Sequence, residues 1–307
     1  MRTTHHVGFA GLGRMGHPMA RQLAGTGPLT VYNRTHSVAE AFASATGATA
    51  AASPRELADD CSVVVTMVAD GQALLGLIDG DDGLAAGLTP GDVVVDMGTS
   101  GSDATRQARD LLRTVGAHLV EAPVSGSVAA AESRQLLVMA AGDEAPLEIA
   151  LPVLQGISDR VVTVGGPGAG AAMKLAVNSV LFAINQAIAE SLVLAERSGI
   201  ERSVAYDVFA SSAVAAPVVH YRRAVFEQPE SAPVTFTIDL AIKDLDLVLA
   251  LGAEVGAPLP QVAANREAMR AAAAAGMGPA DMGAVAVHLR QAAGEPAGDE
   301  GGSPSPT

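Results

Sequence analysis

Short apolar runs alternate with segments of helical character along the first half of the chain, from Val7 to about Gly165. We predict strands at Val7–Ala10, Leu29–Tyr32, Val63–Val68, Val93–Asp96, His118–Glu121, Leu136–Ala140 and Val161–Val164. Alternation of this kind indicates βαβ units and a largely parallel sheet that is covered by helices on both faces.

The pattern changes after Gly165-Gly-Pro-Gly-Ala-Gly170, where strand signals end and apolar positions recur at helical spacing. We expect a long helix from about Ala171 to Ser198, with Gly199 as its stop, and this helix is apolar over most of its circumference. Further helices are predicted at Ser203–Ser211, Ala216–Phe226, Ile238–Val255 and Gln261–Ala275.

These elements predict an α/β protein with two domains. An N-terminal domain with a parallel sheet takes residues 1–166, and an all-α domain takes residues 167–292 and is joined to it through the long interdomain helix. Residues 293–307 are acidic and rich in glycine, proline and serine, a composition that predicts a disordered tail.

The bulk composition limits the classes of function. The chain is 49% hydrophobic and 3% aromatic, its formal net charge is −14, and it contains no basic block. These features argue against a nucleic-acid groove, so a small molecule and further copies of the chain are the expected partners. We expect a cytoplasmic protein without a membrane span, because no apolar run nears ~18 residues and the amino end lacks a signal-peptide layout. The single Cys61 and the scattered histidines predict neither a disulfide nor a metal site.

A glycine-rich turn follows the first predicted strand at once. Gly11-Leu12-Gly13-Arg14-Met15-Gly16 lies between that strand and a helix, which is the context of a dinucleotide-binding loop. Gly11 allows the tight turn, Gly13 lets the backbone approach a pyrophosphate, and Gly16 lets the helix and the strand pack closely.

The second predicted strand ends at Asn33-Arg34-Thr35, where NAD-specific sites usually carry an acidic residue. The planar guanidinium of Arg34 and the hydroxyl of Thr35 suit a 2′-phosphate, and no carboxylate is present to repel it. NADP(H) is therefore favoured over NAD(H). The alternative is that Arg34 is an ordinary solvated residue after a strand.

Lysine is rare in this chain, since Lys174 and Lys243 are the only two among 19 lysines and arginines. An ammonium can release a proton near neutral pH once burial or a neighbour lowers its pKa, whereas guanidinium stays charged. Both lysines are therefore candidate site residues, and the alternative is that they are two leftover surface lysines.

Three further segments complete an ordered set of motifs: Asp96-Met-Gly-Thr99, Glu121-Ala-Pro-Val-Ser125-Gly126-Ser127 and Gly168-Ala-Gly170-Ala-Ala-Met-Lys174-Leu-Ala-Val-Asn178. With the glycine loop before them and Lys243-Asp-Leu-Asp-Leu247 after them, their order and spacing resemble the β-hydroxyacid dehydrogenase family. That family includes 3-hydroxyisobutyrate dehydrogenase and the tartronate semialdehyde and succinic semialdehyde reductases. The resemblance runs from Val7 to about His288 and implies a Rossmann-type N-terminal domain.

The resemblance also implies a role for each matching residue. Lys174 would be the general acid and base, and Asn178, four residues later on the same helix, would orient Lys174 and the substrate oxygen. Ser125, Gly126 and Ser127 would hold the carboxylate of the substrate. The other matches concern the cofactor: Thr99 near the nicotinamide, Lys243 closing over the cofactor, and Met67-Val68-Ala69 beside it.

The sequence departs from the family's pattern at three positions. Gly98 replaces the usual serine before Thr99, and Ser127 replaces a frequent second glycine after Ser125. We expect Ser127 to narrow or re-aim the carboxylate pocket, which leaves the identity of the substrate acid open. Glu121 stands where aspartate is common, and little consequence is expected from it.

The leading hypothesis is an NADPH-dependent reductase of a small semialdehyde or ketoacid, equivalently a β-hydroxyacid dehydrogenase. One alternative is the reduction of an imine or of a specialised-metabolism intermediate, but imine reductases commonly lack the lysine found here at Lys174. The other is a non-catalytic dinucleotide-binding protein, and the presence of both Lys174 and Asn178 counts against it. The apolar circumference of the long helix predicts a homodimer or a larger homo-oligomer.

Overall fold

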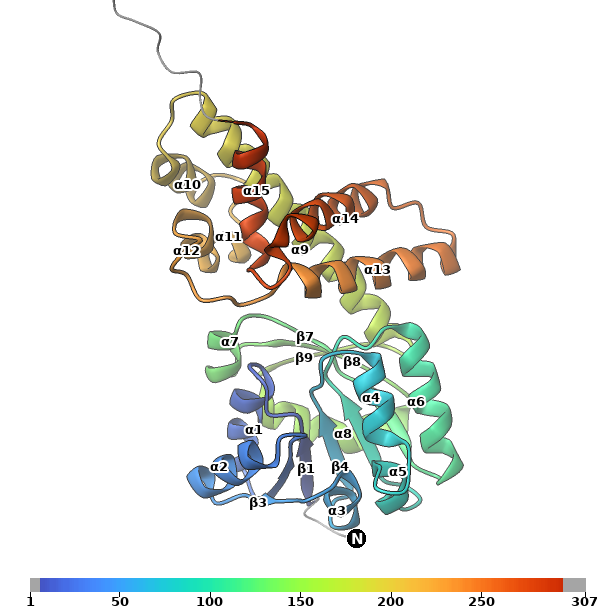
Figure 1. Ribbon diagram of the computed structural model, residues 1–307. Helices are drawn as coiled ribbons and strands as arrows, with labels where there is room; N and C mark the ends of the chain where they lie inside the picture. Colours follow the sequence, from blue (N-terminus) through green and yellow to red (C-terminus); the bar gives the residue numbers. More distant parts are fainter. Residues whose placement is uncertain (1–5, 295–307) are drawn as a thin grey trace, which may run out of the picture. The chain divides into compact units, whose positions relative to one another are not determined.

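The computed structural model describes residues 6–294, and the chain divides into two compact units between Val177 and Asn178. The predicted architecture is confirmed, because a Rossmann-type domain is followed by a helical domain and one long helix links them (Figure 1). Most of the predicted disordered tail, residues 295–307, lies outside the described residues.

The N-terminal unit is built around a nine-stranded sheet. Its strands are β1 (Val7–Ala10), β2 (Leu29–Tyr32), β3 (Thr49–Ala50), β4 (Val63–Thr66), β5 (Val93–Asp96), β6 (His118–Glu121), β7 (Val124–Ser125), β8 (Leu137–Ala141) and β9 (Arg160–Gly165). Their order is β3-β2-β1-β4-β5-β6-β8-β7, with β9 beside β8. The strands from β3 to β6 along this order are parallel, and β8 pairs in the antiparallel sense with both β6 and β7.

The strand order reverses between β1 and β4, because the chain passes from β1 to β2 on one side and later returns to β4 on the other. Ligands of open α/β sheets bind at such a reversal, outside the carboxyl ends of the strands. The glycine loop follows β1 at this point.

Helices cover the sheet on both faces (Figure 1). The first face is covered by α1 (Gly16–Ala24), α2 (His36–Thr46), α7 (Val128–Glu132) and α8 (Glu144–Ile157). The second face is covered by α3 (Pro54–Asp59), α4 (Gly71–Ile78), α5 (Leu84–Gly87) and α6 (Ser102–Thr114). Val63 and Val65 contribute to the first apolar core and Val64 to the second, which explains why the central strands are continuous valine runs.

Two of the strands were not predicted, because β3 and β7 are two residues long and too short to show a period. β4 ends at Thr66, two residues before the predicted end at Val68. Thr66, Asp96 and Glu121 end three adjacent strands side by side, since the register pairs Thr66 with Asp96 and Asp96 with Glu121. All three side chains are buried at the edge of the sheet that carries the glycine loop.

The rest of the described chain is helical. After the linking helix α9 (Ala169–Arg197), its helices are α10 (Arg202–Ser211), α11 (Pro217–Tyr221), α12 (Arg223–Glu227), α13 (Ile238–Val255), α14 (Pro260–Ala272) and α15 (Val285–Ala292). A π-helical turn, Ala273–Met277, follows α14, and a 3₁₀ turn, Met282–Ala284, precedes α15. The predicted bounds of α13 are confirmed, whereas α15 was not predicted.

The prediction of one helix over Ala216–Phe226 is wrong, because the chain leaves helical geometry at Arg222 between α11 and α12. The buried Arg222 guanidinium donates to the carboxylate of Asp281, which also accepts the backbone N–H groups of Thr235, Phe236 and Gly283. Burial raises the pKa of Asp281, but Arg222 and these amides outweigh burial and hold the pKa below its ordinary value. A distant ion pair therefore fixes this corner of the helical domain.

By length and composition α9 is the one helix among residues 6–294 that could cross a membrane. Core helices of globular proteins pass the same test. Phe182, Ala189 and Leu192 of α9 are buried within the helical domain, so we interpret α9 as a core helix that also links the two domains.

Candidate functional site

The glycine loop has the geometry of a dinucleotide site. Gly11 adopts φ +98°, which favours glycine, and its N–H donates to the carbonyl of Tyr32 at 2.9 Å. A side chain at Gly16 would collide with the Gly11 carbonyl, whereas a Cβ at Gly13 would meet no atom within 4 Å. The backbone at Gly13 therefore faces open space, into which a pyrophosphate fits.

A cavity of about 490 Å³ opens beside this loop. The predicted cofactor residues that line it are Gly11, Gly13, Asn33, Arg34, Thr35, Met67, Val68 and Ala69. Arg34 is the one charged residue among those lining the cavity, and no carboxylate lines it. Both observations fit a ligand that carries a negative charge near Arg34.

Other predicted cofactor residues do not line this cavity. Leu12 and Gly16 are buried, and Arg14 and Met15 lie on the loop outside the lining set. Sequence reasoning missed the lining residues Tyr32, Pro54, Ala73, Gly76 and Leu77. They come from three separate elements and belong to no motif, so nothing in the sequence marks them.

Asn33 connects the glycine loop to the turn that follows β2. Its Oδ1 accepts the N–H of Leu12 at 3.0 Å, and its Nδ2 donates to the carbonyl of Thr35 at 3.1 Å. The glycine loop is thereby tied to the end of β2, where Arg34 is exposed to solvent. Asn33 thus holds the turn that presents Arg34 to the cavity.

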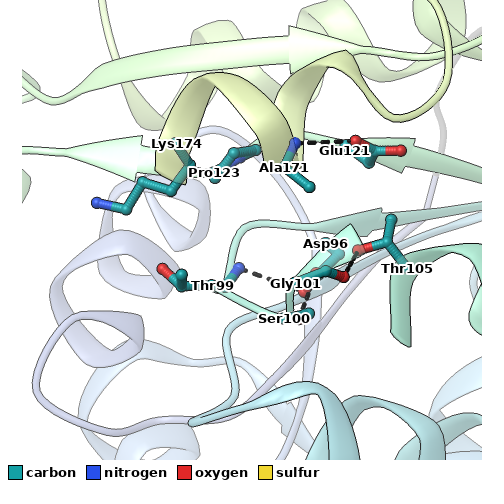
Figure 2. Close-up of a pocket in the computed structure, with 10 residues that line it drawn as sticks. Asp96, Thr99, Ser100, Gly101, Thr105, Glu121, Pro123, Ala171 and Lys174 are labelled. Carbon is teal, nitrogen blue, oxygen red and sulfur yellow. Dashed lines mark hydrogen bonds between the residues drawn. The ribbon is translucent and has the colours of Figure 1, made fainter. Parts of the chain in front are cut away.

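A second pocket of about 10 Å³ is lined in part by Lys174, near the start of α9. This volume is enough for about one water molecule. The residues that line it are Asp96, Gly98, Thr99, Ser100, Gly101, Thr105, Glu121, Pro123, Ala171 and Lys174 (Figure 2). The structure thus brings Lys174 and Thr99 to one pocket, although their motifs are far apart in the sequence.

The turn that carries Thr99 is held by the buried carboxylate of Asp96. One oxygen accepts from the Thr66 hydroxyl at 2.9 Å and the Gly98 N–H at 3.2 Å, and the other accepts from the Ser100 hydroxyl at 2.7 Å. Burial raises the pKa of Asp96 more strongly than these donors lower it, and nearby Glu121 raises it further. Asp96 was not predicted as a site residue, and it is the group that orders this turn.

Gly98, the first departure from the family's pattern, occupies a tight position. A Cβ there would lie 3.1 Å from the carbonyl oxygen of Val68 and 3.3 Å from Oδ1 of Asp96. A larger residue would have to shift the turn, so glycine fits here without strain.

The predicted carboxylate loop begins two residues after Pro123 but does not line the pocket around Lys174. Gly126 adopts φ +146°, and a Cβ there would come within 2.8 Å of Leu136. The Ser127 hydroxyl accepts the Ala130 N–H at 3.3 Å and caps α7. Ser127 therefore has a structural use for its hydroxyl that the sequence did not reveal.

Two predicted residues lie in the helical unit and share one partner. Asn178 is 2% exposed and donates from Nδ2 to Oδ2 of Asp244 at 2.7 Å. The Nζ of Lys243 lies 2.8 Å from Oδ1 of the same carboxylate. Asp244, which is 1% exposed, was missed, although it follows Lys243 in the motif. Among the described residues, no group of three or more metal-ligating side chains is placed to hold a metal.

Comparisons with known proteins cover both domains. A family model described as the NAD binding domain of 6-phosphogluconate dehydrogenase matches residues 6–166. A second, described as NAD-binding of NADP-dependent 3-hydroxyisobutyrate dehydrogenase, matches residues 168–289. Together they span nearly all of the described chain.

Curated relatives and solved structures agree with these matches. The chain is 34% identical over 280 residues to glyoxylate/succinic semialdehyde reductase 1 of Arabidopsis thaliana, which covers 91% of this chain and 96% of the relative. It is 33% identical over 291 residues to 3-sulfolactaldehyde reductase of Escherichia coli (strain K12), covering 94% and 97%. The structure of Mycobacterium tuberculosis 3-hydroxyisobutyrate dehydrogenase with L-serine aligns with a TM-score of 0.81 at 30% identity, covering 94% of this chain and 100% of that one. Solved imine reductases match at 20% identity or less and show the fold alone.

Proposed function

Since the chain belongs to the β-hydroxyacid dehydrogenase family, we propose that it is an NADP(H)-dependent enzyme that interconverts a small β-hydroxyacid and its semialdehyde or ketoacid. The observation that carries the proposal is the pocket that Lys174 shares with Thr99. Two of the named relatives are reductases of glyoxylate, succinic semialdehyde or 3-sulfolactaldehyde, and the third is a 3-hydroxyisobutyrate dehydrogenase, which supports a small oxo or hydroxy acid as the substrate of this chain.

Lys174 is the proposed proton donor. When bound, NADPH supplies the hydride to the carbonyl carbon. The Lys174 ammonium donates a proton to the carbonyl oxygen in that direction, and the neutral amine accepts a proton in the reverse direction. Asn178 lies one helical turn further along α9 and orients Lys174 and the substrate oxygen, while Asp244 holds the Asn178 amide in one orientation.

The loop after β7 is the proposed site for the substrate carboxylate. The Ser127 hydroxyl caps α7 as an acceptor, so its O–H group can still donate to the carboxylate, together with the backbone amides of the loop and the hydroxyl of Ser125. The glycine conformation at Gly126 sets the direction of these amides. A carboxylate can be held in this way without a fixed cation.

NADP(H) is the proposed cofactor, held by the 490 Å³ cavity beside the glycine loop. Gly13 leaves room for the pyrophosphate, and Arg34 and Thr35, which line the cavity, are the proposed contacts of the 2′-phosphate. The lack of a carboxylate among the lining residues supports NADPH over NADH, because an acidic residue would repel the extra phosphate.

The proposal is tested by measuring initial rates on a panel of semialdehydes, ketoacids and β-hydroxyacids with each cofactor. We expect turnover of at least one semialdehyde or ketoacid, with a higher kcat/KM for NADPH than for NADH. Turnover of cyclic imines alone would move the function to imine reduction. Tight NADPH binding without turnover of any aldehyde would favour a non-catalytic dinucleotide-binding protein.

Substitution of the two lysines tests the proton donor. Lys174→Ala should lower kcat by about 10²-fold or more while NADPH binding stays nearly unchanged. Lys174→Arg should restore little, because guanidinium does not readily release its proton. Lys243→Arg is the matched control, since a charge that closes over the cofactor tolerates arginine and its loss changes mainly KM. Near-native kcat in Lys174→Arg would show that Lys174 is an electrostatic anchor instead.

We further propose a cytoplasmic homodimer or larger homo-oligomer. On α9, Val180 is 59% exposed and Leu194 is 69% exposed, and a second copy of the chain is the proposed cover for these apolar side chains. Light scattering at micromolar concentration tests this, and a monomer alone would refute it.

A further inference from the structure

The Glu121 carboxylate, at the end of β6, accepts hydrogen bonds from groups that are far apart in the sequence. Its Oε1 accepts from the Arg109 guanidinium at 2.6 Å and from the Gly168 N–H at 2.7 Å. Its Oε2 accepts from the Ala171 N–H at 3.0 Å. The side chain is 3% exposed, so these donors replace the water that the carboxylate loses on burial.

The chain at the start of α9 is shaped to receive this carboxylate. Gly168 adopts φ +95°, which favours glycine. A Cβ at Gly170 would lie 2.8 Å from Cβ of Glu121 and 3.2 Å from its Oε2. Any side chain at Gly170 would push the helix away from Glu121, so the two glycines permit the contact.

These bonds anchor the first turn of the helix that carries Lys174. The first amides of a helix have no partner within it, and its N-terminus favours a negative charge. The Ala171 N–H is one of these amides, and Glu121 supplies both the acceptor and the charge. Lys174 lies three residues after Ala171, so the two residues share one side of the helix (Figure 2).

The length of the side chain matters at this position. The end of β6 cannot advance toward α9, because Glu121 is paired with Asp96 of β5 and with Ala141 of β8. An aspartate carboxylate on the same backbone would stop about one C–C bond, roughly 1.5 Å, short of the amides. The sequence led us to expect little consequence from glutamate here, and the hydrogen bonds of Glu121 indicate a larger one.

We propose that Glu121 is a positioning residue for the proton donor, with Arg109 as its counterion: it locks the first turn of α9 and thereby fixes where Lys174 presents its ammonium. This inference rests on the proposed role of Lys174. Glu121 itself contacts no reacting group. Its loss would release the amides of Gly168 and Ala171, loosen that turn and spread the positions of Lys174, while the cavity beside the glycine loop stays intact.

Glu121→Gln is the direct test, because glutamine keeps the size but cannot accept both sets of donors. The fraction of folded enzyme is measured by titration with NADPH, and kcat is expressed per cofactor-binding site. We expect kcat to fall about tenfold or more, since small misplacements of a catalytic group are costly, while the Kd for NADPH changes by less than about twofold. Hydrogen exchange of the amides from 168 to 174 should become faster in the variant. An unchanged kcat, or unchanged exchange in this segment, would overturn the proposal.

A conservative variant and a control exclude a general effect on folding. Glu121→Asp keeps the charge but places the carboxylate short of the Gly168 and Ala171 amides, so its kcat should also fall below that of the wild type. A wild-type kcat in Glu121→Asp would show that the reach of the carboxylate does not matter and would overturn the proposal. Glu148→Gln removes the same charge from an exposed position on α8 and should leave kcat and exchange unchanged.

A double-mutant cycle separates this inference from the proposed function. If Glu121 acts through Lys174, adding Glu121→Gln to Lys174→Ala should lower the residual kcat by no more than about twofold. If Glu121→Gln lowers kcat in the Lys174→Ala background by the same factor as in the wild type, the positioning role is overturned, even where Lys174 is the proton donor. If Lys174→Ala alone leaves kcat intact, Lys174 is not the proton donor, and both the proposed function and the positioning role fail. Hydrogen exchange of the amides from 168 to 174 still shows, in that case, whether Glu121 holds the first turn of the helix.

Discussion

The proposed preference for NADPH rests on one exposed arginine, so Arg34→Ala is the most direct test of cofactor choice. Arg34 is the one charged residue among those that line the 490 Å³ cavity, so its removal leaves no other lining cation for a 2′-phosphate. A hydrogen bond to a charged group contributes about 1.5–3 kcal/mol, and exposure to solvent and salt reduces that value. We therefore expect a loss of about 1–3 kcal/mol, which corresponds to a rise in the Kd for NADPH of roughly 5- to 150-fold.

The assay is a fluorescence titration of the wild type and Arg34→Ala with NADPH and with NADH. The Kd for NADH should barely change, because NADH has no 2′-phosphate. The loss for NADPH should shrink as the salt concentration rises, since screening weakens an exposed charge pair. Arg113→Ala removes a similar charge from an exposed position on α6 and should change neither Kd. Equal losses for both cofactors would refute the reasoning and would mean that Arg34 does not contact the phosphate.

Three further predictions concern a buried ion pair, a loop glycine and a buried carboxylate. Asp281→Ala should lower the free energy of unfolding by about 3–5 kcal/mol in urea titrations, because it leaves the Arg222 guanidinium buried without its partner. The folded state lowers the pKa of Asp281, so the stabilisation by its carboxylate should be present above the unfolded pKa of about 3.9 and lost as pH falls through the folded value. The difference in the free energy of unfolding between the wild type and Asp281→Ala should therefore become smaller in acid. Gly126→Ala should lower both kcat/KM and the melting temperature, because its φ of +146° is strained for alanine, and an unchanged kcat/KM would remove the loop from the substrate site. Asp244→Ala should lower kcat more than it raises the Kd for NADPH, because Asn178 loses the group that orients its amide, and Asp244→Asn, whose side-chain oxygen can still accept from Asn178, should restore part of kcat.

The sequence by itself determined the fold class and much of the cofactor domain. Alternating apolar runs predicted the strands, and Gly11–Gly16 predicted where the dinucleotide loop lies, because these features depend on local periodicity and on backbone conformations that few residues adopt. The ordered motifs also identified Lys174 and Thr99 as candidates, and the end of the second predicted strand identified Arg34. Their placement at two pockets of the first domain agrees with this interpretation, and their roles stay predictions.

Tertiary structure alone decided which buried hydrogen bonds hold the candidate site residues in place. Asp96 and Glu121 look like ordinary strand ends in the sequence, and only the strand register and the return of the chain at α9 bring donors to their carboxylates. Arg222, at the break between α11 and α12, likewise has its partner 59 residues away in the sequence, in the carboxylate of Asp281. A buried charge needs partners, and those partners come from wherever the fold brings the chain together, which local sequence patterns do not encode.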